Sequence, residues 1–204
     1  MKKMLYVLVI TFLSFTIYSC AKKSDSSSSS STTELEGTWK VSCYNSSGSQ
    51  YLEKTLTISG TNVTDKWEYH SDSSCATDNY SWDTTYSSLS IGDEMVFSSY
   101  GSSGGTGHQL TMTVDTNTYT PLSASDVTSS NDNSWCGESD WVLNTPQSIA
   151  GKTCGGDTWW NLNIAIYGLY ILDGTKLIPN FQSSTSGSYP SSVSSSTSNI
   201  YIKQ

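Results

Sequence analysis

Apolar and polar side chains alternate along several short stretches of the chain, with turn-forming residues between them. The stretch GTWKVSC places Trp39, Val41 and Cys43 on every second position, and similar alternation recurs at 80–86 and 110–114. A period of two puts successive side chains on opposite faces of a strand, so each stretch predicts one apolar and one polar face. Because no stretch after residue 20 keeps apolar residues at helical spacing for three turns, we predict an all-β, antiparallel fold.

The strands expected from this pattern span most of the chain beyond residue 36. They cover residues 37–44, 51–59, 63–70, 80–86, 94–100, 108–115, 140–144, 159–166, 168–173, 175–179 and 198–203. In the third of them Val63, Trp67 and Tyr69 form the apolar row, which Asp65 interrupts. Turn signals support this division, since Gly60-Thr61-Asn62 separates two runs and Asp173-Gly174 is typical of a two-residue hairpin.

The most apolar part of the chain beyond residue 20 is WWNLNIAIYGLYIL, residues 159–172. Its apolar residues alternate rather than recur at helical spacing, so we interpret it as two strands broken at Gly168. Glycine- and serine-rich composition predicts loops at 101–107 and 183–198, and we expect a third long loop at 116–135.

The N-terminal residues predict export. Residues 1–19 carry two lysines followed by an apolar run of about 15 residues, as a signal peptide does, whereas a transmembrane anchor needs roughly 20. Ile17-Tyr18-Ser19-Cys20 resembles the lipobox of bacterial lipoproteins, which implies cleavage before Cys20 and a Cys20 that carries diacylglycerol and a further acyl chain. By analogy with lipoprotein sorting, Ala21 favours the outer membrane, on its periplasmic face or at the cell surface.

Residues 20–34 read as a lipidated cysteine followed by a flexible, serine-rich tether, because they cannot bury enough apolar surface to become ordered. Residues 35–204 are long enough for one domain with a sizeable core. The chain has 10 Lys, no Arg and 18 acidic residues, a formal net charge of -8. A nucleic-acid or anionic-lipid surface would need a basic patch, so we exclude both as direct partners of the domain.

Four cysteines follow Cys20, at positions 43, 75, 136 and 154. An even number in an exported chain predicts two disulfides, with three pairings open from the residues alone. A zinc site is the alternative use, but the close C-x(2–4)-C spacing of such sites does not occur.

The residues show no recognisable catalytic constellation. His70 and His108 are not in a metal-binding or triad spacing, and we expect His70 on the polar face of its strand. The Asn/Asp-rich stretch 129–140 offers oxygen ligands for calcium but lacks the EF-hand pattern, and such stretches are more often turns. Carboxylates such as Asp65 and Glu94 could form an acid–base pair if the strands brought them together, but the sequence does not give their separation. Because no catalytic constellation is recognisable, we predict a non-enzyme without cofactor or metal.

A longer pattern then adds a family resemblance. Gly37-x-Trp39-x(3)-Cys43, Trp67-x-Tyr69 and Asp72-x(2)-Cys75 are similar to the lipocalin-like domain of the adenomatosis polyposis coli down-regulated family of Wnt inhibitors, and to small bacterial lipoproteins of unassigned function. The likeness covers about residues 36–90, and 168–181 resemble the ends of those lipoproteins.

What the resemblance implies is an antiparallel lipocalin-like β-barrel. In such a barrel Trp39 and Val41 face the interior as its floor, and Cys43, on the same face, pairs with Cys75, which leaves Cys136 with Cys154. The Wnt inhibitors have two such domains and this chain has one, so a Wnt-like partner is set aside.

Two functions from different classes fit these observations. The first is a membrane-anchored envelope lipoprotein whose barrel binds a small apolar ligand or an envelope component, with Trp39, Trp67, Tyr69, Trp82 and Tyr86 as candidate contacts. The simpler interpretation of these rings is that they fill the barrel. The second function is therefore a non-enzymatic adhesion, shielding or assembly module with a solid barrel and exposed loops. The sequence identifies neither the ligand nor a protein partner.

Overall fold

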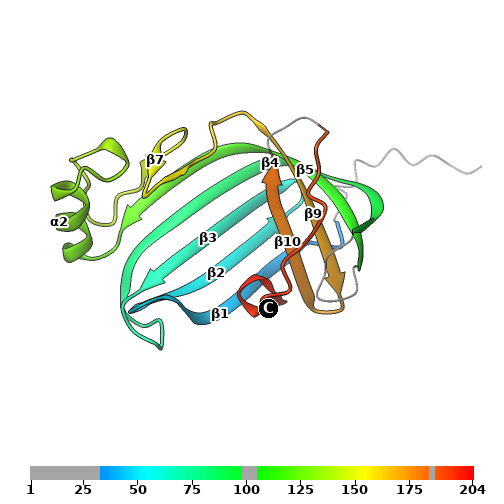
Figure 1. Ribbon diagram of the computed structural model, residues 1–204, viewed down its shortest axis with the longest axis horizontal. Helices are drawn as coiled ribbons and strands as arrows, with labels where there is room; N and C mark the ends of the chain where they lie inside the picture. The colour runs from blue at the N-terminus through cyan, green and yellow to red at the C-terminus, as the bar shows by residue number, and fades with distance from the viewer. Residues whose placement is uncertain (1–32, 98–104, 184–186) are drawn as a thin grey trace, which may run out of the picture. The chain divides into compact units, whose positions relative to one another are not determined.

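The computed structural model describes residues 33–97, 105–183 and 187–204, and for Phe97, Gln182 and Ser183 the backbone alone (Figure 1). The predicted signal peptide, Cys20 and the tether as far as residue 32 lie outside the described residues, as do the last three residues of the predicted 94–100 strand and parts of the loops 101–107 and 183–198. Within the described residues, no helix is long and apolar enough to cross a membrane.

Eight strands pair in chain order to form a closed antiparallel barrel, in which the last strand returns to the first (Figure 1). This arrangement confirms the predicted all-β fold of one domain, a lipocalin-like barrel. The strands are β1 (Gly37–Ser47), β2 (Gln50–Ser59), β3 (Asn62–His70), β4 (Asp78–Phe97), β5 (Gly105–Pro121), β9 (Ala165–Asp173), β10 (Lys176–Ser183) and β11 (Tyr201–Lys203).

Tight turns set the register of consecutive strands, as their sequences predict. Ser59 pairs with Asn62, and Asp173 pairs with Lys176, so each hairpin has a two-residue loop. Gly60 and Gly174 both have φ of 58°, which a side chain disfavours and glycine adopts freely.

The core fills one part of the barrel interior. Alternate residues of β2 point inward and are buried, among them Leu56 and Ile58. Trp39 is 1% exposed, packs in the same cluster, and donates from its indole nitrogen to the carbonyl of Leu35 at 2.8 Å. The cluster is completed by Leu35, Val41, Val63, Tyr86, Leu89, Leu110, Met112, Val114, Ile166, Tyr170, Leu177 and Tyr201.

A β-bulge in β1 corrects the expected place of Cys43. Val41 pairs with Lys54, but the next inward residue of β2, Leu52, pairs with Tyr44. The extra residue shifts the alternation by one, so Tyr44 takes the inward position that we assigned to Cys43.

Both disulfides have the pairing that the resemblance implies, Cys43 with Cys75 and Cys136 with Cys154. The first joins β1 to the loop between β3 and β4. In that loop the Asp72 carboxylate accepts the backbone N–H groups of Ser74 at 2.9 Å and Thr77 at 2.7 Å. Hydrogen bonds from Ser74 hold the pKa of Asp72 below its usual value, and the carboxylate in turn holds the loop in a turn conformation.

Several predicted strand boundaries are wrong. The stretch 80–86 and the described part of the predicted 94–100 strand, residues 94–97, belong to one long strand, β4, and 140–144 is not a strand. Residues 159–164 are irregular, and β9 begins at Ala165 and runs through Gly168 without a break. A Cβ on Gly168 would lie 2.8 Å from the carbonyl oxygen of Asn180 on β10, so this glycine permits close strand contact rather than a turn.

Residues 122–164 form an insertion between β5 and β9, and its helix α2 (Ala124–Asp132) lies beyond the end of β5 (Figure 1). Trp141 and Ile149 of this insertion form a second core cluster with Tyr119 of β5 and the Cys136–Cys154 disulfide. The elements of the insertion are α2, the 3₁₀ helix η1 (Trp135–Gly137), β6 (Gln147–Ser148), β7 (Thr153–Cys154) and β8 (Asp157–Thr158).

The expected loop 116–135 is therefore wrong: 116–121 extend β5, and 124–132 form α2. The helix escaped the pattern analysis because it is polar, with Ser130 as its buried residue. It is specified by its N-cap instead, since the hydroxyl of Ser123 accepts the N–H of Asp126 at 3.1 Å.

The C-terminal segment covers the outer face of β9 and β10. Val193, Tyr189 and Ile200 pack there against buried residues of both strands, including Leu169 and Ile178. The segment then forms the 3₁₀ helix η2 (Thr197–Asn199), and the predicted 198–203 strand is reduced to β11.

Candidate ligand-binding pocket

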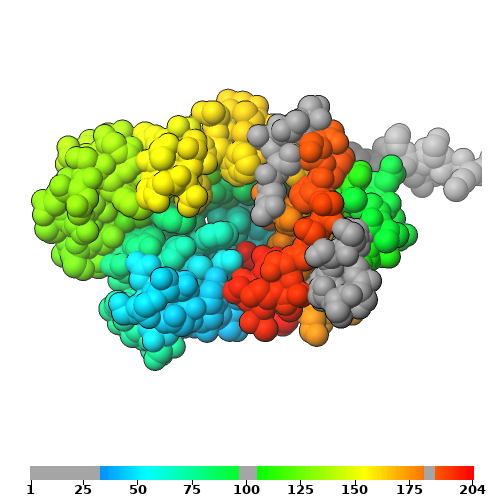
Figure 2. All heavy atoms as spheres, viewed as in Figure 1, coloured from blue at the N-terminus to red at the C-terminus, as the bar shows by residue number. Residues whose placement is uncertain are grey.

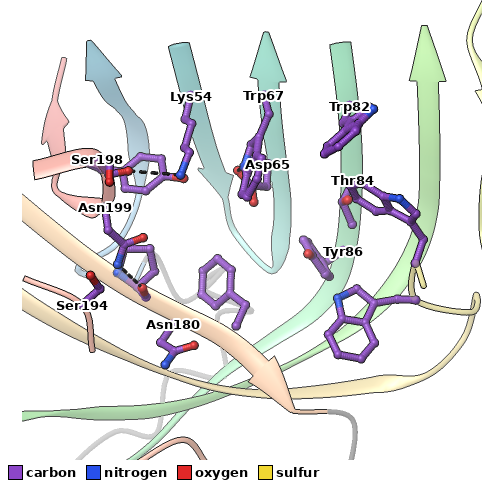
Figure 3. A pocket seen from close by; sticks show the side chains of 15 residues that line it. Lys54, Asp65, Trp67, Trp82, Thr84, Tyr86, Asn180, Ser194, Ser198 and Asn199 are labelled. Atoms are coloured by element: carbon purple, nitrogen blue, oxygen red, sulfur yellow. Dashed lines mark hydrogen bonds between the residues drawn. The ribbon is translucent and has the colours of Figure 1, made fainter. Parts of the chain in front are cut away.

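The barrel contains a cavity of about 420 Å³ between the inward faces of β2–β4 and β10. Figure 2 shows this face of the molecule hollowed where the cyan strands lie beside the red and orange C-terminal segments. Figure 3 shows the side chains that surround it. They belong to Lys54, Asp65, Trp67, Trp82, Thr84, Tyr86, Trp159, Trp160, Pro179, Asn180, Phe181, Ser194, Ser198, Asn199 and Tyr201.

Seven of the lining residues are aromatic, and the strand register explains how two of them meet. Trp67 on β3 pairs with Trp82 on β4, so both rings point inward with centroids 6.5 Å apart. Trp159, from the segment before β9, meets Trp82 edge-on at 4.7 Å. Tyr86 and Phe181 contact one another across the interior at 6.3 Å. The cavity therefore offers aromatic faces and edges from strands on both sides of the barrel.

Asp65 brings a carboxylate into this aromatic setting (Figure 3). It is on the inward row of β3, opposite Leu56 of β2 and Thr84 of β4, and does not interrupt that row. The indole N–H of Trp67 donates to its Oδ1 at 3.0 Å. Burial raises the pKa of Asp65 to about 6, although this hydrogen bond and the charge of Lys54 favour its ionised form.

Lys54 faces the cavity from β2 and is 8% exposed. Its ammonium donates to the carbonyl of Ser198 at 3.1 Å and lies 4.3 Å from the centroid of the Trp67 ring. Burial lowers the pKa of Lys54, and the charge of Asp65 opposes this effect. The two charged groups share the cavity but form no ion pair within 4.0 Å.

A buried amide fixes the tryptophan segment against the barrel wall. Asn117 of β5 is 1% exposed and accepts the hydroxyl of Thr84 at 2.6 Å. Its amide group donates to the carbonyl of Trp160 at 2.7 Å. Both contacts involve neutral groups that are shielded from water, so they hold this side of the pocket firmly.

The C-terminal segment forms the facing side. The amide of Asn199 donates to the carbonyl of Pro179 at 3.0 Å, and the amide of Asn180 donates to the carbonyl of Ser192 at 2.7 Å. Together with the bond from Lys54 to Ser198, these contacts tie residues 192–199 to two different strands. The pocket wall is therefore built from segments far apart in the sequence.

The candidate contacts proposed from sequence separate into two groups. Trp67, Trp82 and Tyr86 line the cavity, and Tyr86 also packs in the core cluster at its edge. Trp39 is in the packed core instead, and Tyr69 stacks on Tyr80 of the neighbouring strand at 4.5 Å. The two groups differ in their position along the barrel axis. Depending on that position, an inward-facing residue contacts the cavity, the packed core or the insertion.

Sequence reasoning missed the charged and C-terminal parts of the lining. Asp65 has the same parity as Val63 and Trp67, which was a usable signal that it points inward. Lys54 likewise lies on the same face of its strand as Leu52 and Leu56, two residues from each. No local signal identifies the residues from 159–160 and 194–201, because their contribution depends on the return of the chain.

His70 and Glu94, two further groups considered from the sequence, do not line the cavity. His70 is not at the surface as expected: it is 5% exposed, and its Nδ1 lies 3.1 Å from Oδ1 of Asp78. Glu94 is exposed on β4 and does not line the cavity with Asp65. Over the described ranges, no three His, Cys, Asp or Glu side chains are grouped as metal ligands.

Comparison with known proteins assigns no family to the chain, since no family model matches it and no curated protein is significantly similar.

Proposed function

We propose that this chain is an envelope lipoprotein whose barrel binds a small, largely apolar ligand. The observation that carries the proposal is the cavity of about 420 Å³ inside a closed barrel, lined by seven aromatic residues. Cavities of about 300–1,000 Å³ with apolar walls and a few polar groups are typical of ligand sites. A barrel whose interior were filled by its side chains would suit the adhesion or shielding alternative better, and the cavity argues against it.

The proposed anchor is the lipid on Cys20. The features that support it are the signal-like residues 1–19, the lipobox-like residues before Cys20 and the serine-rich tether. Several acyl chains on one residue give stable membrane attachment, whereas a single chain is marginal. Labelling cells with radioactive palmitate should mark the wild-type protein, and Cys20→Ser should abolish the label and release the protein from membranes. Undiminished labelling of Cys20→Ser would overturn this part.

Ligand binding is tested with the fluorescent probe N-phenyl-1-naphthylamine. We expect saturable binding with enhanced fluorescence, together with a bound small molecule in native mass spectrometry of freshly purified protein. Ser194→Trp places an indole at the cavity wall and should weaken probe binding. Ser195→Trp is the matched control, because Ser195 is exposed beside it and does not line the cavity. An empty protein without saturable probe binding would refute the proposal, and so would equal effects of the two substitutions.

A further inference from the structure

The two charged groups of the pocket differ in how many of their hydrogen-bonding positions are occupied. This difference indicates a class of ligand. Asp65 is the one carboxylate among the described lining residues, and Trp67 provides its single hydrogen bond. An ionised carboxylate has room for about four such bonds. Lys54 is better provided for, since its ammonium has the Ser198 carbonyl and the Trp67 ring.

Resting on the proposed function, we propose that the ligand is a small organic cation, an amine or quaternary ammonium with an apolar body. Asp65 is its counter-ion, and the aromatic side chains of the cavity, among them Trp82, Tyr86 and Phe181, surround the charge and the body. The face of an aromatic ring carries partial negative charge, so a desolvated cation is attracted to it. A carboxylate within an aromatic enclosure therefore complements a hydrophobic cation in both shape and charge.

An anionic ligand fits the same cavity less well. Lys54 would attract an anion, but Asp65 and the faces of the aromatic rings would repel it. The Lys54 ammonium also already donates a hydrogen bond to the Ser198 carbonyl, which would compete with the anion. The whole chain points the same way, because its formal net charge of -8 favours the approach of cations and disfavours that of anions. A neutral apolar ligand would cover the half-buried carboxylate without giving it a further partner.

Three probes of similar shape distinguish these cases in isothermal titration calorimetry with the purified protein. Benzyltrimethylammonium carries a permanent positive charge, neopentylbenzene is its neutral isostere, and 4-tert-butylbenzoate is an anion of similar size. We expect the cation to bind at least about tenfold more tightly than the neutral isostere, as one desolvated charge–ring and charge–carboxylate contact predicts. The anion should bind most weakly of the three.

Two substitutions test whether Asp65 and Lys54 cause the preference for the cation. Asp65→Asn keeps the size and an acceptor for the Trp67 indole, and should reduce the cation's advantage over the isostere by about tenfold without changing the isostere's affinity. Lys54→Met keeps the apolar stem and should strengthen cation binding. Near-ultraviolet circular dichroism confirms that each variant has the wild-type fold.

The outcomes separate this inference from the proposed function. If the isostere binds but the cation has no advantage, or Asp65→Asn leaves that advantage intact, the cation inference is wrong and the pocket remains a ligand site. Tighter binding of the benzoate overturns the inference in the same way. If none of the three probes binds and N-phenyl-1-naphthylamine does not bind, both are overturned.

Discussion

Neutralising Asp65 should make the protein more stable at neutral pH but not at acidic pH. The carboxylate lies inside the barrel, where burial disfavours its charge and raises its pKa from 3.8 to about 6. Several groups face it: Lys54 from β2 and the Trp67 indole favour ionisation, whereas Asp83 from β4 opposes it. The phenols of Tyr86 and Tyr201 also lie within its electrostatic reach.

The sign follows from proton binding in the two states. Between pH 3.8 and about 6 the folded protein holds a proton on Asp65 that the unfolded chain has released, so the free energy of unfolding falls as the pH rises. The stability that the protonated Asp65 contributes to the folded state is fully present below pH 3.8 and lost above about pH 6. At about 1.36 kcal/mol per pKa unit, this interval corresponds to about 3 kcal/mol.

The assay is urea unfolding followed by tryptophan fluorescence at intervals from pH 4 to pH 8. Asn at position 65 stays neutral, so Asp65→Asn should match the wild type near pH 4 and exceed its free energy of unfolding by about 3 kcal/mol above pH 6.5. Glu94→Gln, which changes an exposed carboxylate of β4, is the control and should follow the wild type. A difference between wild type and Asp65→Asn that is independent of pH, or that grows toward acid, would refute the reasoning.

Three further variants test the packing of the barrel and of the insertion. Trp39→Ala removes a fully buried ring and should lower the free energy of unfolding by about 3–5 kcal/mol in urea titrations, and a loss below about 1 kcal/mol would contradict its place in the core. Gly168→Ala forces a methyl group against the Asn180 carbonyl and should cost at least about 1 kcal/mol, so an unchanged urea midpoint would contradict the close contact of β9 and β10. Replacing Cys136 and Cys154 together by Ser opens a loop with a sequence separation of 18 and should cost about 3 kcal/mol, which an unchanged midpoint in reducing and non-reducing buffer would disprove.

The alternation of the sequence correctly predicted the strands whose inward faces pack against the barrel core. Val41, Leu56 and Val63 lie on inward rows that the alternation marks, and the hairpin at Gly174 follows from its residue type. The prediction failed at Trp159, whose apolar character looked like that of a strand. Its ring instead lines the cavity from an irregular segment, and a local pattern does not distinguish an apolar wall from an apolar strand face.

The candidate site was predictable in part for a related reason. Trp67, Trp82 and Tyr86 are on rows that alternate visibly, so their inward direction could be inferred. Trp39 has the same pattern but lies in the packed core, because depth along the barrel decides which inward residues reach open space. Asp65 looked like an interruption because a charged residue is unexpected on an apolar face. Its position nevertheless agrees with the period of two, and the structure places it on the inward row.

By itself, the sequence determined the fold class, the main turns and the number of disulfides, because these depend on local periodicity, turn-forming residues and cysteine content. The tertiary structure decided which residues share the cavity. Lys54, Asp65, Trp159 and Tyr201 meet there because the last strand returns to the first and the C-terminal segment is tied to β2 and β10. Such contacts depend on closure of the whole barrel, and a bulge of one residue at Cys43 is enough to change which side chain points inward.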